Sequence, residues 1–395
     1  MRIDSIELFH LAIPLRQPRP SPCGMCEKLE VVLLAMHADG ATGWGEASPG
    51  NAPCAGPEWT GGVYSLLRDR LVPATLGLSV SKGNDLGDHL AAFRGNQFAK
   101  SALDTACWDL RARLQNEPLA QFLSSGSAKT GEANAAIEVG ATFDQMPSID
   151  DLLAAISAAV EAGCSRVKLK FRPGWDVAMV DFVRKEFPVL AIAVDCEAAL
   201  TLGQTEMLYR LEDFSPAMIE QPLPADDLVG HAMVQQSLRT AICLDEGITT
   251  VAQAEMAIEL QSCKCMNLKP GRVGGLTPAL AIHDLCQDAG MPCYVGAAPQ
   301  TGVGLRHGLA LAARPHCTEP ADFFPYNQLL TEDLVEPLRP EKDPSDGRLR
   351  VPLWSRPGID VEPDRAILDR CCIAKTEIST QRTTLKPSNN EGATP

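Results

Sequence analysis

The chain has 395 residues, and 35 Lys and Arg against 50 Asp and Glu give it a net charge of −15 with histidine neutral. This length allows one large core or two domains, and 45% hydrophobic with 22% charged residues is typical of a globular protein. The acidic charge disfavours nucleic acid as a partner. The apolar run Val31–Met36 is far too short to span a membrane, and no signal peptide is visible. We therefore expect a cytoplasmic enzyme without membrane contact.

The first 130 residues indicate strands followed by helices. Ile3–Leu11 alternates apolar and polar residues, Leu29–Met36 is a buried-strand run, and Asp39-Gly40 marks a turn after it. Apolar residues at helical spacing predict a helix over residues 98–114. This region is expected to be an α+β domain.

From residue 135 the pattern alternates between short apolar runs and amphipathic helices. Predicted helices include 148–163, 176–186, 251–260 and 277–289. Predicted strands cover 136–140, 166–170, 190–195, 217–220, 241–245, 264–269, 292–296 and 317–322. This many alternating units predict an α/β fold with a closed (β/α) barrel. The polar stretch 374–395 is expected to be a disordered tail.

Five of these strands end on an ionisable residue: Lys170, Asp195, Glu220, Asp245 and Lys269. The gaps between them are 25, 25, 25 and 24 residues, which is one βα unit each. In a barrel, the carboxyl ends of the strands surround the active site, so these side chains should converge there. Any one of them alone would be a solvated boundary residue, but five in this order of charge predict a catalytic ring.

The ring suits proton abstraction next to a carboxylate. Three carboxylates offer hard oxygen ligands for Mg²⁺, with Mn²⁺ as the expected substitute, and the metal would stabilise an enediolate. Lys170 and Lys269 could address opposite faces of a planar intermediate. Partial burial, the metal and Lys168, two residues earlier on the same face, should lower the pKa of Lys170 so that it can act as a base. A Schiff-base aldolase would not need three metal-type carboxylates.

The 14 cysteines do not form an evident framework. Without an export signal we expect reduced thiols that pack as small apolar residues, and Cys23-x-x-Cys26 lacks a second pair for a zinc site. His283 is interpreted as a surface or packing residue, and His307 and His316 receive no role. Gly271–Gly275 is interpreted as a tight turn beside Lys269 rather than a phosphate loop.

Several motifs resemble the enolase superfamily, within it the muconate-lactonizing subgroup, over roughly residues 1–370. The run Lys-Pro-Gly-Arg-Val-Gly-Gly, which ends at Gly275, is similar to the o-succinylbenzoate synthase and N-acylamino acid racemase branch. The other matching motifs are Lys168-Leu-Lys170, Ile219-Glu-Gln-Pro-Leu223, Asp245-Glu246, Gly43-Trp-Gly-Glu46 and Ser101-Ala-Leu-Asp-Thr-Ala-Cys-Trp108.

The resemblance implies a modified (β/α)7β barrel over residues 131–334. It also implies an α+β capping domain of residues 1–130, completed by about 335–373, whose loops near 15–28 and 48–58 close over the substrate. The expected reaction is an o-succinylbenzoate synthase-type dehydration of a small carboxylate. The alternatives are an N-acylamino acid racemase, a muconate-type cycloisomerase and a non-catalytic carboxylate-binding relative. A homo-oligomer is also expected.

The same resemblance assigns roles to residues. Asp195, Glu220 and Asp245 would bind Mg²⁺, Lys170 and Lys269 would be the acid/base pair, and Lys168 would tune Lys170 or bind the substrate carboxylate. Glu197 and Glu246 would lie just behind the metal ligands. The chain departs from the family at Glu197, where Asn is usual, at Gly247 in place of Ser, and at Gln300 in place of an acid.

Overall fold

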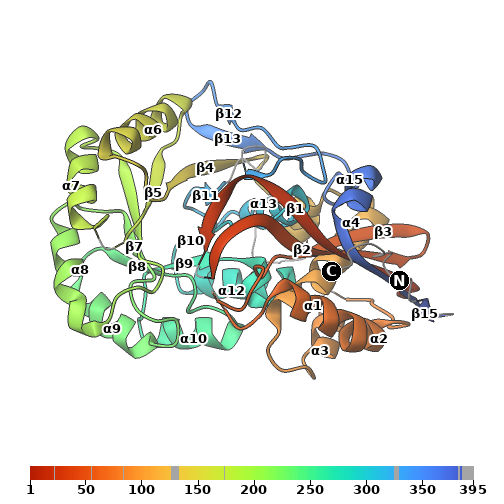
Figure 1. Cartoon of the computed structure of the whole chain (residues 1–395). Coiled ribbons are helices and arrows are strands. Elements are labelled where there is room, and N and C mark those ends of the chain that lie inside the picture. Colours follow the sequence, from red (N-terminus) through yellow and green to blue (C-terminus); the bar gives the residue numbers. More distant parts are fainter. Residues whose placement is uncertain are drawn as a thin grey trace, which may run out of the picture.

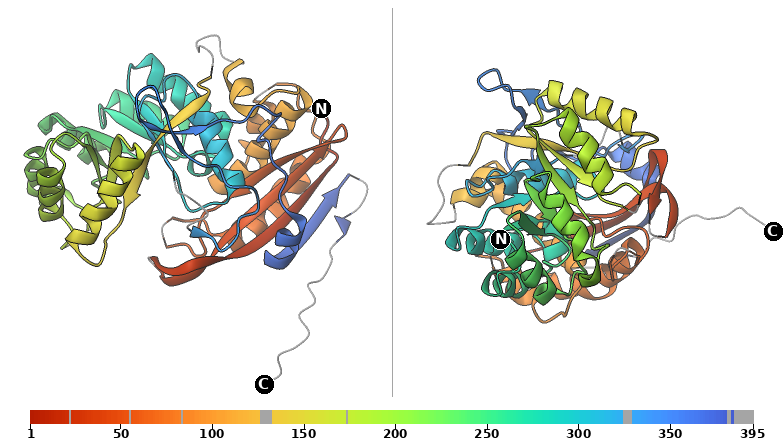
Figure 2. Two further views of the ribbon diagram at one scale, coloured as in Figure 1. Left: turned by 90° about the horizontal axis from the view of Figure 1, so that it is seen from above. Right: turned by 90° about the vertical axis from the view of Figure 1, so that its left-hand side faces the viewer.

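The computed structural model describes residues 1–21, 23–54, 56–82, 84–125, 133–172, 174–323, 329–380 and 383–384. Two sheets organise this part of the chain, a five-stranded one and a ten-stranded one that contains the barrel. They lie side by side, with the long β1–β2 hairpin beside the barrel (Figures 1 and 2). The predicted α/β barrel with a capping domain is therefore the observed fold.

The capping sheet has the strand order β15-β14-β1-β2-β3. The turn between its second and third strands is the predicted one, because Asp39 and Gly40 both have positive φ, 50° and 78°, which a tight hairpin turn requires. The strand bounds are β1 (Ser5–Ser21), β2 (Gly24–Ala38), β3 (Ala41–Ala47), β14 (Cys372–Ser379) and β15 (Thr383–Thr384).

Strand β14 corrects the prediction of a disordered tail from residue 374. It pairs antiparallel with β1 from Ser5↔Ser379 to Leu11↔Cys372. The sequence looks polar, but Thr376 and Ile378 alternate into the core, and Thr376 shares a hydrogen bond of 2.8 Å with the Tyr64 hydroxyl. The prediction is wrong for residues 374–379, and residues 385–395 lie outside the described part.

Glu7 ties this last strand to the rest of the sheet. Its carboxylate lies 3.2 Å from Nε2 of His37 and 2.5 Å from Nζ of Lys375. The His37 hydrogen bond first, then Lys375, lower the pKa of Glu7 to about 2 against partial burial. A carboxylate whose pKa is lower in the folded than in the unfolded protein stabilises the fold at pH values above its unfolded pKa. This stabilisation is lost as the pH falls through 2.

We therefore expect Glu7→Gln to lower the free energy of unfolding by about 1–2 kcal/mol at pH 7, and by almost nothing near pH 2. Urea unfolding at both pH values measures this. The control is Glu377→Gln, at an exposed position opposite Glu7 on β14. Its free energy of unfolding should stay within about 0.5 kcal/mol of the wild-type value at both pH values. An equal loss for Glu7→Gln at both pH values would contradict the ion-pair explanation.

Helices of the first 125 residues pack on the capping sheet. The longest, α4 (Gln97–Leu114), matches the predicted helix and lies against β3. Gly43 and Gly45 permit this approach, because a Cβ on either would meet the Ala106 or Ala102 carbonyl oxygen at 2.2 or 2.1 Å. The others are α1 (Thr60–Leu66), the π-helix η1 (Leu67–Leu71), α2 (Val72–Thr75), α3 (Asp85–Leu90) and α5 (Leu119–Ser125).

The barrel is built from parallel strands that alternate with helices, as predicted. Ladders connect β10 through β9, β8, β7, β6 and β5 to β4, and β11 pairs with the other edge of β4. The strands are β4 (Ala136–Phe143), β5 (Arg166–Lys170), β6 (Ala191–Asp195), β7 (Met218–Glu220), β8 (Ala241–Leu244), β9 (Cys265–Leu268), β10 (Cys293–Val295) and β11 (Ala321–Asp322).

The barrel helices begin where the sequence signals them. Ser148 caps α6 by accepting a hydrogen bond from Asp151 N at 3.1 Å, and Gly163 ends it with φ 107°. The helices are α6 (Ile149–Ala162), α7 (Val177–Glu186), η2 (Leu202–Gln204), α8 (Thr205–Glu212), α9 (Leu228–Ser237), α10 (Val251–Glu259), α11 (Pro270–Val273), α12 (Leu276–Asp288) and α13 (Gly302–Ala312).

The C-terminal segment is shared between the two sheets. β13 (Leu349–Pro352) pairs antiparallel with Ala136–Glu138 of β4 and carries β12 (Glu341–Lys342) at its outer edge. Residues 341–352 therefore extend the barrel sheet, whereas the sequence placed the whole of 335–373 in the cap. The reason is that β5 pairs only with Ala141–Phe143, which leaves the start of β4 open. Helix α15 (Arg365–Cys371) does pack on β1 of the cap.

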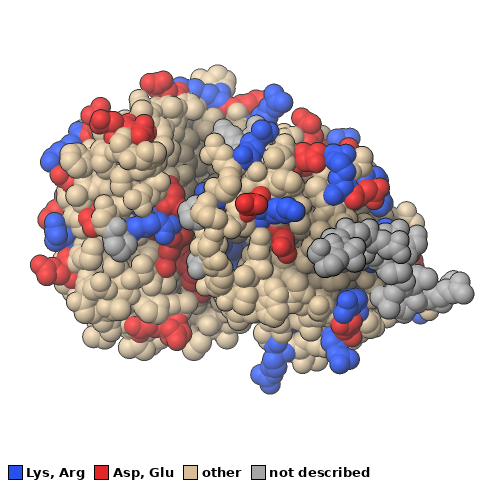
Figure 3. All heavy atoms as spheres, in the orientation of Figure 1, with Lys and Arg blue, Asp and Glu red and all other residues tan. Residues whose placement is uncertain are grey.

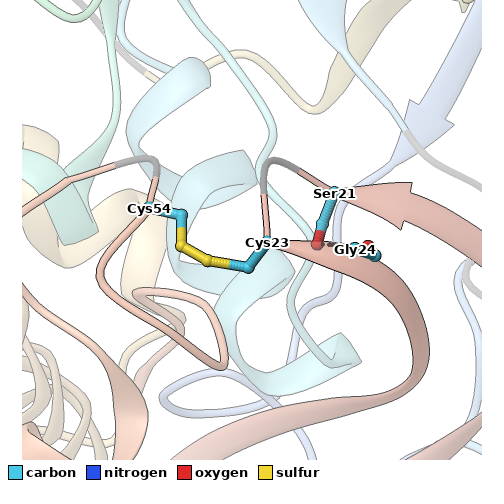
Figure 4. The surroundings of a disulfide bond; sticks show 4 residues. All are labelled: Ser21, Cys23, Gly24 and Cys54. Atoms are coloured by element: carbon cyan, nitrogen blue, oxygen red, sulfur yellow. Dashed lines mark hydrogen bonds between the residues drawn. A yellow bond between two sulfur atoms is a disulfide. The ribbon is translucent and has the colours of Figure 1, made fainter.

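One disulfide corrects the expectation that all thiols are reduced. Cys23, at the tip of the β1–β2 hairpin, is bonded to Cys54 in the segment after β3 (Figure 4). The bond joins the two segments, 15–28 and 48–58, that were predicted to close over the substrate. Asn51 also holds them together, since its amide accepts from Glu30 N at 3.0 Å and donates to Lys28 O at 2.8 Å. Most other cysteines are buried, as predicted.

The surface carries acidic and basic side chains over both parts, and both kinds border the hollow between barrel and cap (Figure 3). No helix of the described residues is long and apolar enough to cross a membrane.

Candidate active site

The five strand-end residues of the predicted ring converge at one end of the barrel. The parallel register places Lys170 beside Asp195, and Asp195 beside Glu220, on β5, β6 and β7. Asp245 follows β8 directly and Lys269 follows β9. The three carboxylates are buried, with side-chain exposures of 3, 0 and 2%, while the two lysines keep 19 and 16% of theirs. The ends of the ring are thus the parts that solvent reaches.

Lys170 contacts two carboxylates. Its Nζ lies 2.8 Å from Oδ2 of Asp195 and 2.6 Å from Oε1 of Glu197. Glu197, the residue that departs from the family pattern, also pairs with Arg172 at 2.8 Å. Burial disfavours the ammonium, but Asp195 and Glu197 outweigh it and raise the pKa of Lys170. This shift is opposite to the predicted one, because Glu197 adds a second negative charge beside the ammonium.

Lys269 has the matching arrangement at the other end of the ring. Its Nζ lies 2.6 Å from Oδ2 of Asp245, and Arg272 pairs with the second oxygen of that carboxylate. Burial alone would raise the pKa of Asp245, but Arg272 and Lys269 lower it well below its usual range. Burial and the Asp245 charge raise the pKa of the adjacent Glu246 to about 7.

A second polar layer lies beneath the ring. Nζ of Lys168 is 2.7 Å from Oε2 of Glu220, 2.6 Å from Oδ2 of Asp322 and 3.0 Å from the Tyr294 hydroxyl. Lys168 is 3% exposed, and its ammonium donates to Tyr294 and Asp322 and pairs with Glu220. Its two predicted roles, tuning Lys170 and binding the substrate carboxylate, stay predictions.

The partners in this layer were not predicted from the sequence. The Tyr294 hydroxyl donates to Oε2 of Glu220 at 2.6 Å, and Asn267 Nδ2 donates to Oε1 at 2.9 Å. One signal was present, because Asn267 precedes Lys269 by two residues just as Lys168 precedes Lys170. Asp322 also ends the last predicted strand, which is the same position that the ring residues hold.

The cap contributes to the mouth of the barrel. Glu46 accepts hydrogen bonds from the backbone N–H groups of Thr301 and Gly304 at 2.9 and 3.0 Å, at the start of α13. Asp104 of α4 likewise accepts from Thr277 N at 2.9 Å, at the start of α12. These carboxylates belong to the two N-terminal motifs, so both motifs fix the cap to helix N-termini of the barrel.

A hollow opens between the two parts (Figure 3). The barrel contributes Lys269, Arg272 and Gln300 to its lining, and the cap contributes Glu46 and Phe98. Gln300, another departure from the family pattern, therefore faces the same space as one of the two lysines.

Two family models match nearly the whole chain. Residues 5–124 match the mandelate racemase / muconate lactonizing enzyme N-terminal domain, and residues 151–367 match the enolase C-terminal domain-like model. The chain belongs to the enolase superfamily. The expected resemblance is thereby confirmed, and the matched ranges correspond to the cap and most of the barrel.

The relatives carry two kinds of activity. The o-succinylbenzoate synthase of Geobacillus stearothermophilus is 37% identical, over 94% of this chain and 96% of its own. The N-succinylamino acid racemase of Thermus thermophilus is 36% identical, over 89% of this chain and 93% of its own. A solved enolase-superfamily structure from Enterococcus faecalis is 32% identical, with a TM-score of 0.88 over 95% of this chain and 99% of its own. Identity alone therefore does not choose between a lyase and a racemase.

Proposed function

We propose that this enzyme removes the proton α to a substrate carboxylate in a Mg²⁺-dependent reaction with an enediolate intermediate. The dehydration that forms o-succinylbenzoate is proposed as its main reaction. One observation carries the proposal: two partly exposed lysines flank three buried carboxylates on five successive strand ends. A small carboxylate is the proposed substrate, and a cytoplasmic homo-oligomer remains a prediction.

The residues fit a divalent cation. Three carboxylates at neighbouring strand ends offer hard oxygen ligands, which are paired here with the lysines and Arg272, and Oε2 of Glu246 is buried nearby without a hydrogen-bond partner among the described residues. Asp195, Glu220 and Asp245 would hold Mg²⁺, or Mn²⁺ in its place. When bound, the metal would offset the carboxylate charges and the negative charge that develops on the substrate.

The two lysines supply the proton chemistry. Lys170 ends β5 and Lys269 ends β9, with the three carboxylate strands between them, so their ammonium groups approach a bound substrate from opposite sides. In the dehydration, Lys170 takes the α-proton and returns it to the departing hydroxyl group, which leaves as water, while Lys269 stabilises the enediolate with its positive charge. Arg272 and Asp245 hold Lys269 in place for this role.

An N-succinylamino acid racemase is the second candidate. The observation that favours it is the symmetry of the ring, because each lysine is bonded to one ring carboxylate and is exposed to a similar degree. Two equivalent lysines could deliver or remove a proton on either face, which racemisation needs. Among the described residues, no contact specifically favours a muconate-type cycloisomerisation.

Two assays with Mg²⁺ present separate these functions. One follows the formation of o-succinylbenzoate, and the other follows the optical rotation of a panel of N-succinyl amino acids. We expect kcat/KM for the dehydration to exceed that for any racemisation by at least about tenfold. The reverse order would make racemisation the main reaction, and inactivity in both assays would favour the non-catalytic relative.

Replacing Glu197 should change the pH dependence of the reaction. The Glu197 charge raises the pKa of Lys170, which must lose its proton to act as a base. We expect Glu197→Gln to move the acidic limb of the kcat/KM profile about one unit toward lower pH.

The matched control is Asp144→Asn. Asp144 pairs with Arg172 at 2.8 Å and contacts Lys170 only indirectly, through Arg172 and Glu197. The pH profile of kcat/KM for Asp144→Asn should therefore match that of the wild type. An unchanged profile for Glu197→Gln would show that Glu197 does not set the pKa of the catalytic base.

A further inference from the structure

A cluster of sulfur and imidazole groups lies away from the catalytic ring. It contains His283 of α12, Cys293 of β10 and Cys317, which follows α13 and pairs with Cys293 through a parallel bridge. Their candidate ligand atoms all lie within 4.8 Å of one another. Because Cys293 is the first residue of its strand, the cluster lies at the amino-terminal end of the barrel, opposite the carboxyl ends that carry the ring.

His283 has a buried ring nitrogen that the described residues leave unpartnered. The side chain is fully buried, and its Nε2 has no hydrogen-bond partner among them. Its Nδ1 lies 3.0 Å from Oδ1 of Asp284 and 3.2 Å from Nε of Arg314. Arg314 Nε donates to this same Nδ1, so Arg314 and Asp284 both address one ring nitrogen and Nε2 is the one left for a further ligand. A buried, unpartnered ring nitrogen beside two thiols needs a partner.

The cluster has three protein donors. Cys286 lies three residues after His283 on α12, but its thiol donates to Sδ of Met266 at 3.6 Å and it is not one of them. In a tetrahedral zinc site, bond lengths of about 2.0–2.3 Å place neighbouring ligand atoms about 3.5–3.8 Å apart. The three donor atoms here lie within 4.8 Å of one another, which permits that spacing after small side-chain adjustments. Cys317 is only half-buried, which leaves an entry path for an ion.

We propose that His283, Cys293 and Cys317 form a soft-metal site that binds Zn²⁺, with a water molecule as the fourth ligand. Imidazole and thiolate ligands select zinc-class ions, whereas the carboxylates of the catalytic ring select Mg²⁺, so one chain holds two sites with different ion preferences. The zinc site joins α12, β10 and the segment after α13, and its role is to fix these elements to one another. Binding releases the thiol protons to solvent.

Cobalt spectroscopy on the whole protein tests the site. The protein is reduced with a phosphine, saturated with Mg²⁺ and titrated with Co²⁺, since only thiolate ligands give the intense thiolate-to-cobalt charge-transfer band. We expect one equivalent of this band, its displacement by one equivalent of Zn²⁺, and a higher melting temperature with Zn²⁺. Absence of the band in the folded wild-type protein would overturn the proposal.

Cys317→Ser and its control identify the ligands. Cys372 is also half-buried but lies in the cap, so Cys372→Ser matches Cys317→Ser in chemistry and exposure. We expect Cys317→Ser to weaken Zn²⁺ binding by about 100-fold or more, and Cys372→Ser to leave it unchanged. Both should keep the wild-type rate of the Mg²⁺-dependent reaction. Equal zinc affinity in the two variants, or a peptide map that finds Cys293 bonded to Cys317, would contradict the site.

Discussion

Lys170→Ala is expected to lower kcat for the α-proton reaction by about 10³–10⁴-fold, and Lys269→Ala by a similar factor. Both ammonium groups are held at the barrel mouth by ring carboxylates, and neither neighbouring arginine can take over proton transfer, because a guanidinium stays protonated. Steady-state kinetics at saturating Mg²⁺ measures the loss.

Lys264→Ala is the control for this experiment. Lys264 directly precedes β9, at the end of that strand opposite Lys269, and its Nζ contacts the Leu238 and Arg239 carbonyl oxygens at 3.4 and 3.5 Å. Its replacement should leave kcat within about twofold. A folded Lys170→Ala protein with activity within tenfold of the wild type would contradict the assignment of the ring.

The same variants separate the two candidate reactions. If both lysines exchange protons, each single variant should still exchange the α-proton of one enantiomer of an N-succinyl amino acid, through the lysine that remains. If Lys269 only stabilises the enediolate, Lys269→Ala should slow every α-exchange. Proton NMR in D₂O with each pure enantiomer measures the loss of the α-proton signal and so distinguishes the two cases.

Glu220→Gln is expected to have the second large effect. Glu220 is the central carboxylate of the ring and is fully buried; its oxygens accept from Asn267 and Tyr294, and one of them lies 2.7 Å from Nζ of Lys168. Removing its charge should weaken Mg²⁺ binding by about 100-fold and lower kcat by about 10³-fold. Isothermal titration calorimetry with Mg²⁺ and steady-state kinetics measure the two losses.

Chelation is the matching experiment on the wild-type protein. EDTA should abolish the activity, and Mg²⁺ or Mn²⁺ should restore it. Glu212→Gln, at the end of α8, removes a carboxylate that accepts from the backbone N–H of Thr240 at 2.7 Å, and it should leave metal binding unchanged. Activity that survives chelation would contradict a metal-dependent reaction.

The ring could be located from the sequence because it depends on one geometric regularity. Each βα unit returns the chain to the same end of a parallel sheet, so residues one unit apart, such as Asp195 and Glu220, become neighbours. The cap helix and most barrel elements followed from apolar periodicity in the same way. The ring and these elements could be predicted because the spacing of apolar residues and the βα unit recur along the chain.

Features that depend on distant contacts could not be predicted. The sequence of β14 looks like a polar tail. Thr376 and Ile378 become core residues only because the strand pairs with β1. The Cys23–Cys54 bond joins segments whose approach the sequence does not reveal. The pKa of Lys170 also depends on Glu197, whose carboxylate reaches it from the loop after the next strand.

Exchange of the substrate α-proton in D₂O tests whether the strand-end ring removes that proton, because both candidate reactions begin with this step. With Mg²⁺ present, the wild-type protein should incorporate deuterium at the α-carbon of at least one N-succinyl amino acid or form o-succinylbenzoate, and the Lys170→Ala, Lys269→Ala double variant should do neither. A double variant that retained wild-type exchange, or a wild-type protein inactive toward every member of both substrate classes, would contradict the account.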